Sequence, residues 1–160
     1  MLSQPKIVHL AAGDGRSFLA LSDLVTFKLT GHQTAEKFAL FELIVPPADG
    51  PPVRHKHAWQ ETFYVLEGAF EFSGQGDDGV SYAVQATAGA MLHVPGSVPH
   101  GYQNVGAASG RLLVISSPSG LELFYAELGV PVADAVQPAT TLPDMARVMA
   151  IGLKYRIEFL

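Results

Sequence analysis

Short apolar runs, broken by glycine and proline, recur along residues 1–117 of the chain. The runs Leu24–Thr30, Lys37–Val45 and Arg111–Ser116 are rich in β-branched and aromatic residues, and turn-forming residues follow each of them. Phe70 and Phe72 flank Glu71, which gives that segment one apolar and one polar face. A period of two is typical of β-strands, and the spacing of the runs predicts about ten strands in a sandwich or barrel.

The expected strands are separated by segments rich in glycine, proline and aspartate. They lie at Ile7–Leu10, Phe18–Leu21, Leu24–Thr30, Lys37–Val45, the run that carries His55 and His57, two strands in Thr62–Phe72 that meet at Glu67-Gly68, Val80–Val84, Met91–Val94, His100–Val105 and Arg111–Ser116. Turns are expected at Gly13–Gly15, Gly31–Gln33 and Ser73–Gly79.

After Pro118 the period of the apolar positions changes from two to about 3.6, which predicts helices. The first helix has an apolar face formed by Leu121, Phe124, Tyr125 and Leu128, and a capping box of Ser119 and Glu122 is expected at its start. Gly129 is expected to end it.

A second helix is expected to begin at Pro143, with Thr141 as N-cap and Asp144 at the third helical position. Its apolar face would hold Met145, Val148 and Met149. We expect both helices to pack on the outside of the β domain, with a lid over a binding site as the alternative role. The chain is therefore predicted to be one domain, with strands and barrel at 1–117 and a helical extension at 118–160.

The composition fits a globular protein, because 48% of the residues are hydrophobic and 16% are charged. The formal net charge is −5 and no cluster of lysine and arginine occurs, so neither a nucleic acid nor a membrane is expected as a partner. The absence of cysteine excludes disulfides, thiolate ligands and a cysteine nucleophile. No signal peptide and no long apolar run is recognisable, so a cytoplasmic location is expected.

The stretch Gly50–Gly68 contains most of the candidate metal ligands. His55 and His57 are one residue apart and face the same side if they lie on a strand, and Glu61 follows four residues after His57. Two imidazoles and a carboxylate on one side of a strand are three parts of a metal site. His100, in a second glycine- and proline-rich stretch, is the candidate for a fourth ligand.

These two stretches together resemble the paired motifs of the cupin superfamily. His55, His57, Glu61 and Gly68 match the first motif, and Gly89, Pro95, His100 and Asn104 match the second. The second motif departs from the pattern at Ser97, where a glycine is usual, and Gly96 precedes it. The resemblance implies an all-β fold, the cupin double-stranded β-helix or jelly-roll barrel, with a short helical C-terminal extension. The C-terminal segment is similar to that of single-domain bacterial cupins of the quercetinase-like type.

Three histidines and one carboxylate suit one divalent transition metal such as Fe, Mn, Ni, Co, Cu or Zn, with open positions for a small-molecule substrate. Strand parity aims Trp59, Phe63 and Tyr102 at the same interior, where an apolar pocket would form. His93 is a further candidate, as a substrate contact or as a partner of a ligand. Arg54 and Lys56 alternate with the histidines and should face away, which argues against a phosphorylated substrate.

The resemblance implies a metal-dependent dioxygenase, with Glu61 as both a metal ligand and a general base for a substrate hydroxyl. Two alternatives remain open at this point: a non-catalytic module that binds or senses a small molecule, and a metal-dependent isomerase or lyase. A homodimer is expected as well, because Lys37–Val45 and Arg111–Ser116 are apolar on both faces.

Overall fold

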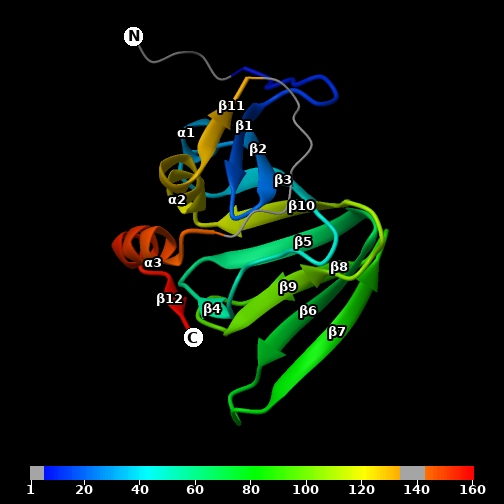
Figure 1. Ribbon diagram of the computed structural model, residues 1–160. Helices are drawn as coiled ribbons and strands as arrows, with labels where there is room; N and C mark the ends of the chain where they lie inside the picture. The colour runs from blue at the N-terminus through cyan, green and yellow to red at the C-terminus, as the bar shows by residue number, and fades with distance from the viewer. Residues whose placement is uncertain (1–5, 134–142) are drawn as a thin grey trace.

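The computed structural model describes residues 6–133 and 143–160. Within them two antiparallel sheets face each other and short helices lie at one side (Figure 1). This arrangement confirms the predicted all-β jelly roll with a helical C-terminal extension.

The larger sheet has seven strands in the order β11-β1-β2-β3-β10-β5-β8, and the smaller has five in the order β12-β4-β9-β6-β7. The strands of the larger sheet are β11 (Val130–Val132), β1 (Arg16–Ala20), β2 (Asp23–Leu29), β3 (Ala39–Val45), β10 (Gly110–Ser117), β5 (Gln60–Glu67) and β8 (Met91–Val94). Those of the smaller sheet are β12 (Glu158–Phe159), β4 (His55–Lys56), β9 (His100–Asn104), β6 (Ala69–Gln75) and β7 (Ser81–Thr87).

The core lies between the two sheets, where every second residue points inward. On β3, Phe41, Leu43 and Val45 are buried, while the residues between them are partly exposed. On β5, Phe63 and Val65 alternate in the same way. This is the period-two pattern that predicted strands, and burial of these side chains contributes about 2 kcal/mol each.

Three expected elements near the turns differ from the structure. Ile7–Leu10 is exposed and forms no strand among the described residues. The expected turn at residue 31 is one helical turn, α1 (Gly31–Thr34), whose first N–H donates to the buried Glu122 carboxylate at 2.8 Å. Strand β6 continues to Gln75 and β7 to Thr87, because the two pair along their whole lengths.

Helix α2 (Leu121–Leu128) buries the predicted face, with Leu121, Phe124 and Leu128 inside. The expected capping box is wrong: Gly120 is the N-cap, and its N–H donates to the Glu122 carboxylate at 2.7 Å. The Ser119 hydroxyl donates instead to Glu36 at 2.7 Å, which ties this turn to the chain after α1.

Helix α3 (Met145–Lys154) begins two residues later than expected. Asp144 is the N-cap and accepts a hydrogen bond from the Arg147 N–H at 3.2 Å, while the expected cap Thr141 lies outside the described residues. Val148 is buried but Met149 is 54% exposed, so the buried stripe continues from Val148 to Gly152. Met149 faces solvent because it is one position further round the helix.

Beyond α3 the chain returns to the barrel, which the sequence pattern did not predict. Strand β12 pairs antiparallel with β4, so that Phe159 lies opposite His55, and the Leu160 N–H donates to the Arg54 carbonyl at 2.9 Å. Figure 1 shows α2, α3 and β12 together on one side of the barrel, beside β4. The C-terminal extension therefore covers the end of the barrel where the histidines lie.

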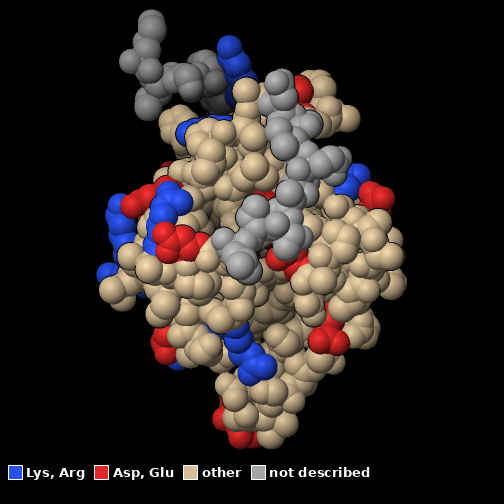
Figure 2. All heavy atoms as spheres, viewed as in Figure 1, with Lys and Arg blue, Asp and Glu red and all other residues tan. Residues whose placement is uncertain are grey.

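The charged side chains are dispersed on the face that Figure 2 shows, where basic and acidic groups alternate across a mostly uncharged surface. No helix in the described ranges combines the length and the apolar run that a membrane crossing requires.

Candidate metal centre

Both sheets contribute to the predicted cluster. His55 lies on β4, directly opposite His100 on β9 in the antiparallel register. His57 follows β4 where the chain bends toward the larger sheet, and Glu61 is an inward-facing residue of β5. His55 and His100 are 45 positions apart in sequence. They meet because β4 and β9 are neighbouring strands.

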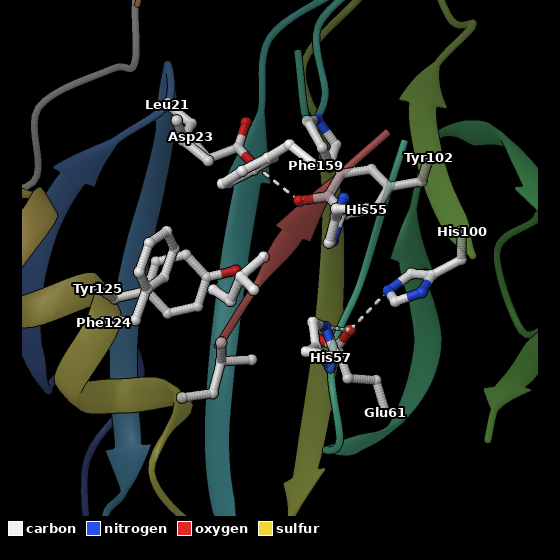
Figure 3. Close-up of a pocket in the computed structure, with 13 residues that line it drawn as sticks. Leu21, Asp23, His55, His57, Glu61, His100, Tyr102, Phe124, Tyr125 and Phe159 are labelled. Atoms are coloured by element: carbon white, nitrogen blue, oxygen red, sulfur yellow. Dashed lines mark hydrogen bonds and ion pairs between the residues drawn. The ribbon is translucent and has the colours of Figure 1, made fainter. Parts of the chain in front are cut away.

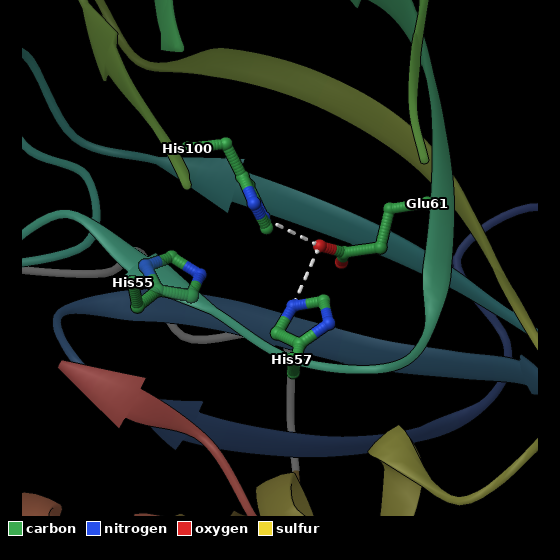
Figure 4. Close-up of side chains that lie close together, drawn as sticks. All are labelled: His55, His57, Glu61 and His100. Atoms are coloured by element: carbon green, nitrogen blue, oxygen red, sulfur yellow. Dashed lines mark hydrogen bonds and ion pairs between the residues drawn. The ribbon is translucent and has the colours of Figure 1, made fainter. Parts of the chain in front are cut away.

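The four side chains converge on one point (Figure 4). One ligand atom from each lies within 4.8 Å of all the others. The Nε2 atoms of His57 and His100 are 3.1 and 2.9 Å from the Glu61 Oε2 atom. His57, Glu61 and His100 are buried, and His55 is partly exposed. The sequence prediction named these four residues, and the structure brings them together.

Backbone carbonyls fix the orientation of all three imidazoles. The Nδ1 atom of His55 lies 3.2 Å from the Val53 oxygen, that of His57 lies 3.2 Å from the Trp59 oxygen, and that of His100 lies 2.8 Å from the Val98 oxygen. An Nδ1–H that donates to a carbonyl leaves Nε2 as the metal-binding nitrogen. Each partner carbonyl is two residues away in sequence, so the local strand conformation sets the ring orientation.

Burial and the neighbouring charges shift the pKa values within the cluster. Burial alone would raise the pKa of Glu61, but hydrogen bonds from His100 and His57 outweigh it and hold that pKa well below its usual range. Burial, reinforced by His100, lowers the pKa of His55 to about 4. Burial also opposes the charge on His100, but the Glu61 carboxylate overcomes it and raises the pKa of His100. The cluster thus holds a charged carboxylate and a neutral His55, both in the form that binds a metal.

The spacing of these atoms fits a metal ion. Donor atoms about 2.1 Å from an octahedral ion lie roughly 3 Å apart when adjacent and about 4.2 Å apart when opposite. The ligand atoms of the cluster lie within 4.8 Å of one another, which is close to that range. The four side chains therefore need to move together only slightly to bind an ion. Three nitrogens and one oxygen, with no thiolate in the chain, suit a divalent first-row metal.

The second-motif turn after β8 is anchored to the histidine segment. The Ser97 N–H donates to the His57 carbonyl at 2.6 Å, and Ser97 has a φ of 68°, a conformation that glycine adopts more readily. Gly96 lies against Ala58, where a Cβ would clash with the carbonyl oxygen. Gly96, which stands one position before the usual motif glycine, is therefore required for close packing against Ala58. Ser97, at the usual glycine position, adopts the left-handed backbone conformation itself.

A cavity of about 40 Å³ adjoins the cluster (Figure 3). Its walls include several residues that were not predicted: Leu21, Asp23, Pro51, Leu121, Phe124, Tyr125, Ile157 and Phe159. The apolar face of α2 was recognised in the sequence, where packing on the outside of the β domain was expected and a lid over a binding site was the alternative. The residues from β2 and from the C-terminus carry no local motif that would mark them.

The four predicted substrate contacts lie in different places. Tyr102 lines the cavity, while Phe63 is buried beneath it with its ring 5.7 Å from that of Tyr102. Trp59 lies behind His57, at 5.3 Å between ring centroids, and its indole N–H donates to the Ser119 carbonyl. His93 is exposed on the outer face of β8, with its Nδ1 2.9 Å from the Thr62 hydroxyl. Of the four, Tyr102 alone is a wall residue.

The two cations near the histidines point outward, as the alternation predicted. Arg54 donates to the Ser81 hydroxyl at 2.9 Å, and Lys56 pairs with Glu158 at 3.2 Å. No lysine or arginine lies among the described residues that line the cavity. An ionised phosphate would therefore meet no counter-charge from a basic side chain there.

Comparison with known proteins identifies similar domains. Residues 41–116 match the family model described as "Cupin domain". A search of the curated proteins finds no match. Among solved structures, oxalate decarboxylase from Bacillus subtilis aligns with a TM-score of 0.59 and 17% identity, over 76% of this chain and 31% of that chain. Recombinant oxalate oxidase in complex with glycolate aligns with a TM-score of 0.54 and 19% identity, over 62% of this chain and 53% of that chain. These structures share the fold, and the aligned part of this chain spans about a third of the oxalate decarboxylase chain and about half of the oxalate oxidase chain.

Proposed function

We propose that this protein, which belongs to the cupin superfamily, is a metal-dependent dioxygenase acting on a small, largely apolar or aromatic hydroxylated substrate. One observation carries the proposal: three imidazole nitrogens and a carboxylate oxygen converge at a cavity with mostly apolar walls. The four side chains would hold the ion beside the cavity, where it would be open to a substrate and could supply Lewis-acid and redox chemistry. A closed structural site would have no use for an adjoining cavity.

When bound, a redox-active first-row metal would supply Lewis-acid and electron-transfer chemistry at the cluster. His55, His57 and His100 would hold it, with their rings fixed by the backbone carbonyls. Glu61 would serve as the fourth ligand and as the base that accepts the proton of a substrate hydroxyl. Phe124, Tyr125 and Phe159 exclude water from the site and offer ring faces to an aromatic substrate.

The size of the cavity limits the substrate. A volume of about 40 Å³ is room for roughly three water molecules, so even a single aromatic ring such as that of catechol enters only when the wall side chains move apart. Small oxygenated molecules are the better match to this state. A flavonol, the substrate class suggested by the similarity to quercetinase-like cupins, would require β12 and its flanking residues to move outward.

The test is oxygen uptake by metal-loaded protein, preceded by elemental analysis of protein as purified. Metal-free protein is loaded separately with Fe, Mn, Ni, Co, Cu or Zn and given acetylacetone, catechol or quercetin at an oxygen electrode. We expect stoichiometric metal binding, and substrate-dependent oxygen consumption with at least one redox-active metal and none with Zn.

Other outcomes would support the alternatives. If an oxygenated substrate is converted without consumption of oxygen, the protein would be assigned as an isomerase or lyase and not as a dioxygenase. Tight ligand binding without turnover by any metal form would favour a binding or sensing module. If the protein binds none of the six metals, the assignment of a metal site, and with it the proposed function, is contradicted.

A further inference from the structure

Asp23 is a second acidic residue in the same cavity, and the metal cluster does not use it. It is the first residue of β2 and lies opposite Ala20 in the β1–β2 hairpin. The connecting residues Leu21 and Ser22 have φ values of 54° and 81°, as in a type I′ turn. Such a turn normally has asparagine or glycine at these positions, so a non-glycine pair maintains a costly conformation here. The conformation brings Leu21 and Asp23 to the cavity wall together.

Half of the Asp23 carboxyl group lacks a protein partner. Asp23 is 5% exposed, and its Oδ2 atom accepts a hydrogen bond from the Tyr102 hydroxyl at 2.8 Å. Its Oδ1 atom is buried without any hydrogen-bond partner. A buried polar atom left unpaired destabilises a protein by about 1–3 kcal/mol. Because an unpaired buried oxygen destabilises the fold, the position of Asp23 Oδ1 in a cavity wall indicates that a ligand forms the missing hydrogen bond.

Tyr102 holds this carboxyl group on the same side of β9 as the metal cluster. It follows His100 by two residues on β9, so the two side chains face the same interior about 7 Å apart along the strand. Figure 3 places the Asp23–Tyr102 hydrogen bond toward one end of the cavity and the Glu61–His100 contact toward the other. The wall that completes the cavity comes largely from apolar residues of α2 and the C-terminus.

We infer that Asp23, positioned by Tyr102, binds a hydroxyl group of the substrate at the end of the cavity away from the metal ligands. A hydroxyl both donates and accepts hydrogen bonds, so it pairs with Oδ1 whether or not that oxygen carries a proton. An anionic group would be repelled by the nearby charge of Asp49, and by Asp23 as well when Asp23 is ionised. The substrate is then a molecule with one oxygen function at the metal cluster and a separate neutral hydroxyl at Asp23.

This inference rests on the proposed function, because it takes a substrate at the metal cluster as its starting point. The test compares catechol with pyrogallol and 1,2,4-trihydroxybenzene, which add a third hydroxyl at two different ring positions. Affinities are measured by anaerobic calorimetry on zinc-loaded protein, where no oxidation occurs. We expect at least one triol to bind about fivefold to tenfold more tightly than catechol, as one added hydrogen bond implies.

The variant Asp23→Leu should abolish that gain, so that the triol and catechol bind equally. Tyr102→Phe, which removes the group that positions Asp23, should reduce the gain and provides a second variant if Asp23→Leu folds poorly. Asp49→Asn is the matched control: it removes the neighbouring charge but leaves Asp23 intact, and the gain should persist.

The possible failures are distinguishable. If catechol binds but neither triol gains affinity, or if the gain survives in Asp23→Leu, the role of Asp23 is overturned while the metal site stands. If zinc-loaded wild-type protein binds none of the three compounds, both this inference and the proposed substrate class are overturned. Zinc content and melting temperature, measured for every variant, separate these results from unfolding.

Discussion

At the scale of single residues, the three histidines differ in how they support the cluster. His57 and His100 are buried and contact Glu61, while His55 is partly exposed and contacts the C-terminal Phe159 ring at 6.2 Å between centroids. His57 is also tied to the second-motif turn through its carbonyl, which accepts from Ser97. It is therefore the ligand with the most extensive set of fixed contacts.

Replacing His57 with alanine should remove most of the bound metal, because one of four ligands is lost. We expect metal per chain to fall by at least about tenfold after dialysis, measured by elemental analysis. His93→Ala is the control, since that imidazole lies outside the cluster on the outer face of β8. Equal metal content in wild type and His57→Ala would contradict the assignment of the cluster.

Asp23 should make the stability of the metal-free protein dependent on pH. Burial raises its pKa from 3.8 to about 8, against the Tyr102 hydrogen bond and with the help of Asp49. The folded state therefore holds a proton that the unfolded state releases, and stability falls as pH rises from about 4 to about 8. Between pH 5 and pH 8, wild type should lose about 2 kcal/mol or more beyond any loss in Asp23→Asn.

Urea unfolding of both proteins at the two pH values measures this difference. The variant has no group that titrates at position 23, so other titrating groups cancel in the comparison. Parallel losses in the two proteins would show that Asp23 is not held in its neutral form.

At the scale of elements, the C-terminal strand β12 is short but contributes to the wall of the site. It pairs with β4 through only two residues, and Ile157 and Phe159 line the cavity. The Lys56–Glu158 ion pair at 3.2 Å is largely exposed and stabilises this contact little. The packing of the Phe159 ring against Gly152 of α3 and beside His55 holds the strand in place.

Replacing Phe159 with alanine should enlarge the cavity and admit larger ligands. We expect quercetin to bind metal-loaded Phe159→Ala at least about tenfold more tightly than wild type, followed by its absorbance spectrum on titration. Unfolding stability should fall by about 1–3 kcal/mol, less than for a fully buried phenylalanine. Leu160→Ala, next in sequence and 54% exposed, is the control. Identical quercetin affinities in Phe159→Ala and wild type would show that β12 does not limit access.

The elements also show which parts of the site could be predicted from sequence. His55, His57 and Glu61 follow a local spacing that the sequence shows directly, although they lie on β4, on the bend after it and on β5. Strand alternation fails for Trp59, because the chain bends between β4 and β5 there. His93 was named for its place in the second motif, and it faces outward because Leu92 and Val94 take the inward side of β8. Asp23 meets Tyr102 across 79 residues, and no local pattern encodes such a contact. The same holds for β12, whose two residues are too few to give a period.

At the scale of the whole molecule, the outer face of β10, β5 and β8 in the larger sheet carries exposed apolar side chains among the described residues. The barrel interior covers the inner face, while Leu113, Tyr64 and Met91 lie side by side on the outer face of β10, β5 and β8. Tyr64 is 44% exposed and Met91 is 60% exposed, and Ile115 on the same face is 39% exposed. Contiguous apolar residues on a flat sheet surface are typical of protein interfaces.

We expect a second copy of the chain to cover this face, because a twofold dimer pairs the same patch on both subunits and requires no other partner. Wild-type protein should then have a mass by light scattering of twice the 17.0 kDa chain. The double variant Tyr64→Glu/Ile115→Glu should have the mass of one chain, because two buried charges in each subunit would oppose association. Leu153→Glu, which changes a 78% exposed residue of α3, should leave the dimer intact. A wild-type protein with the mass of one chain at micromolar concentration would refute the dimer, and a double variant that still dimerises would place the interface on another face.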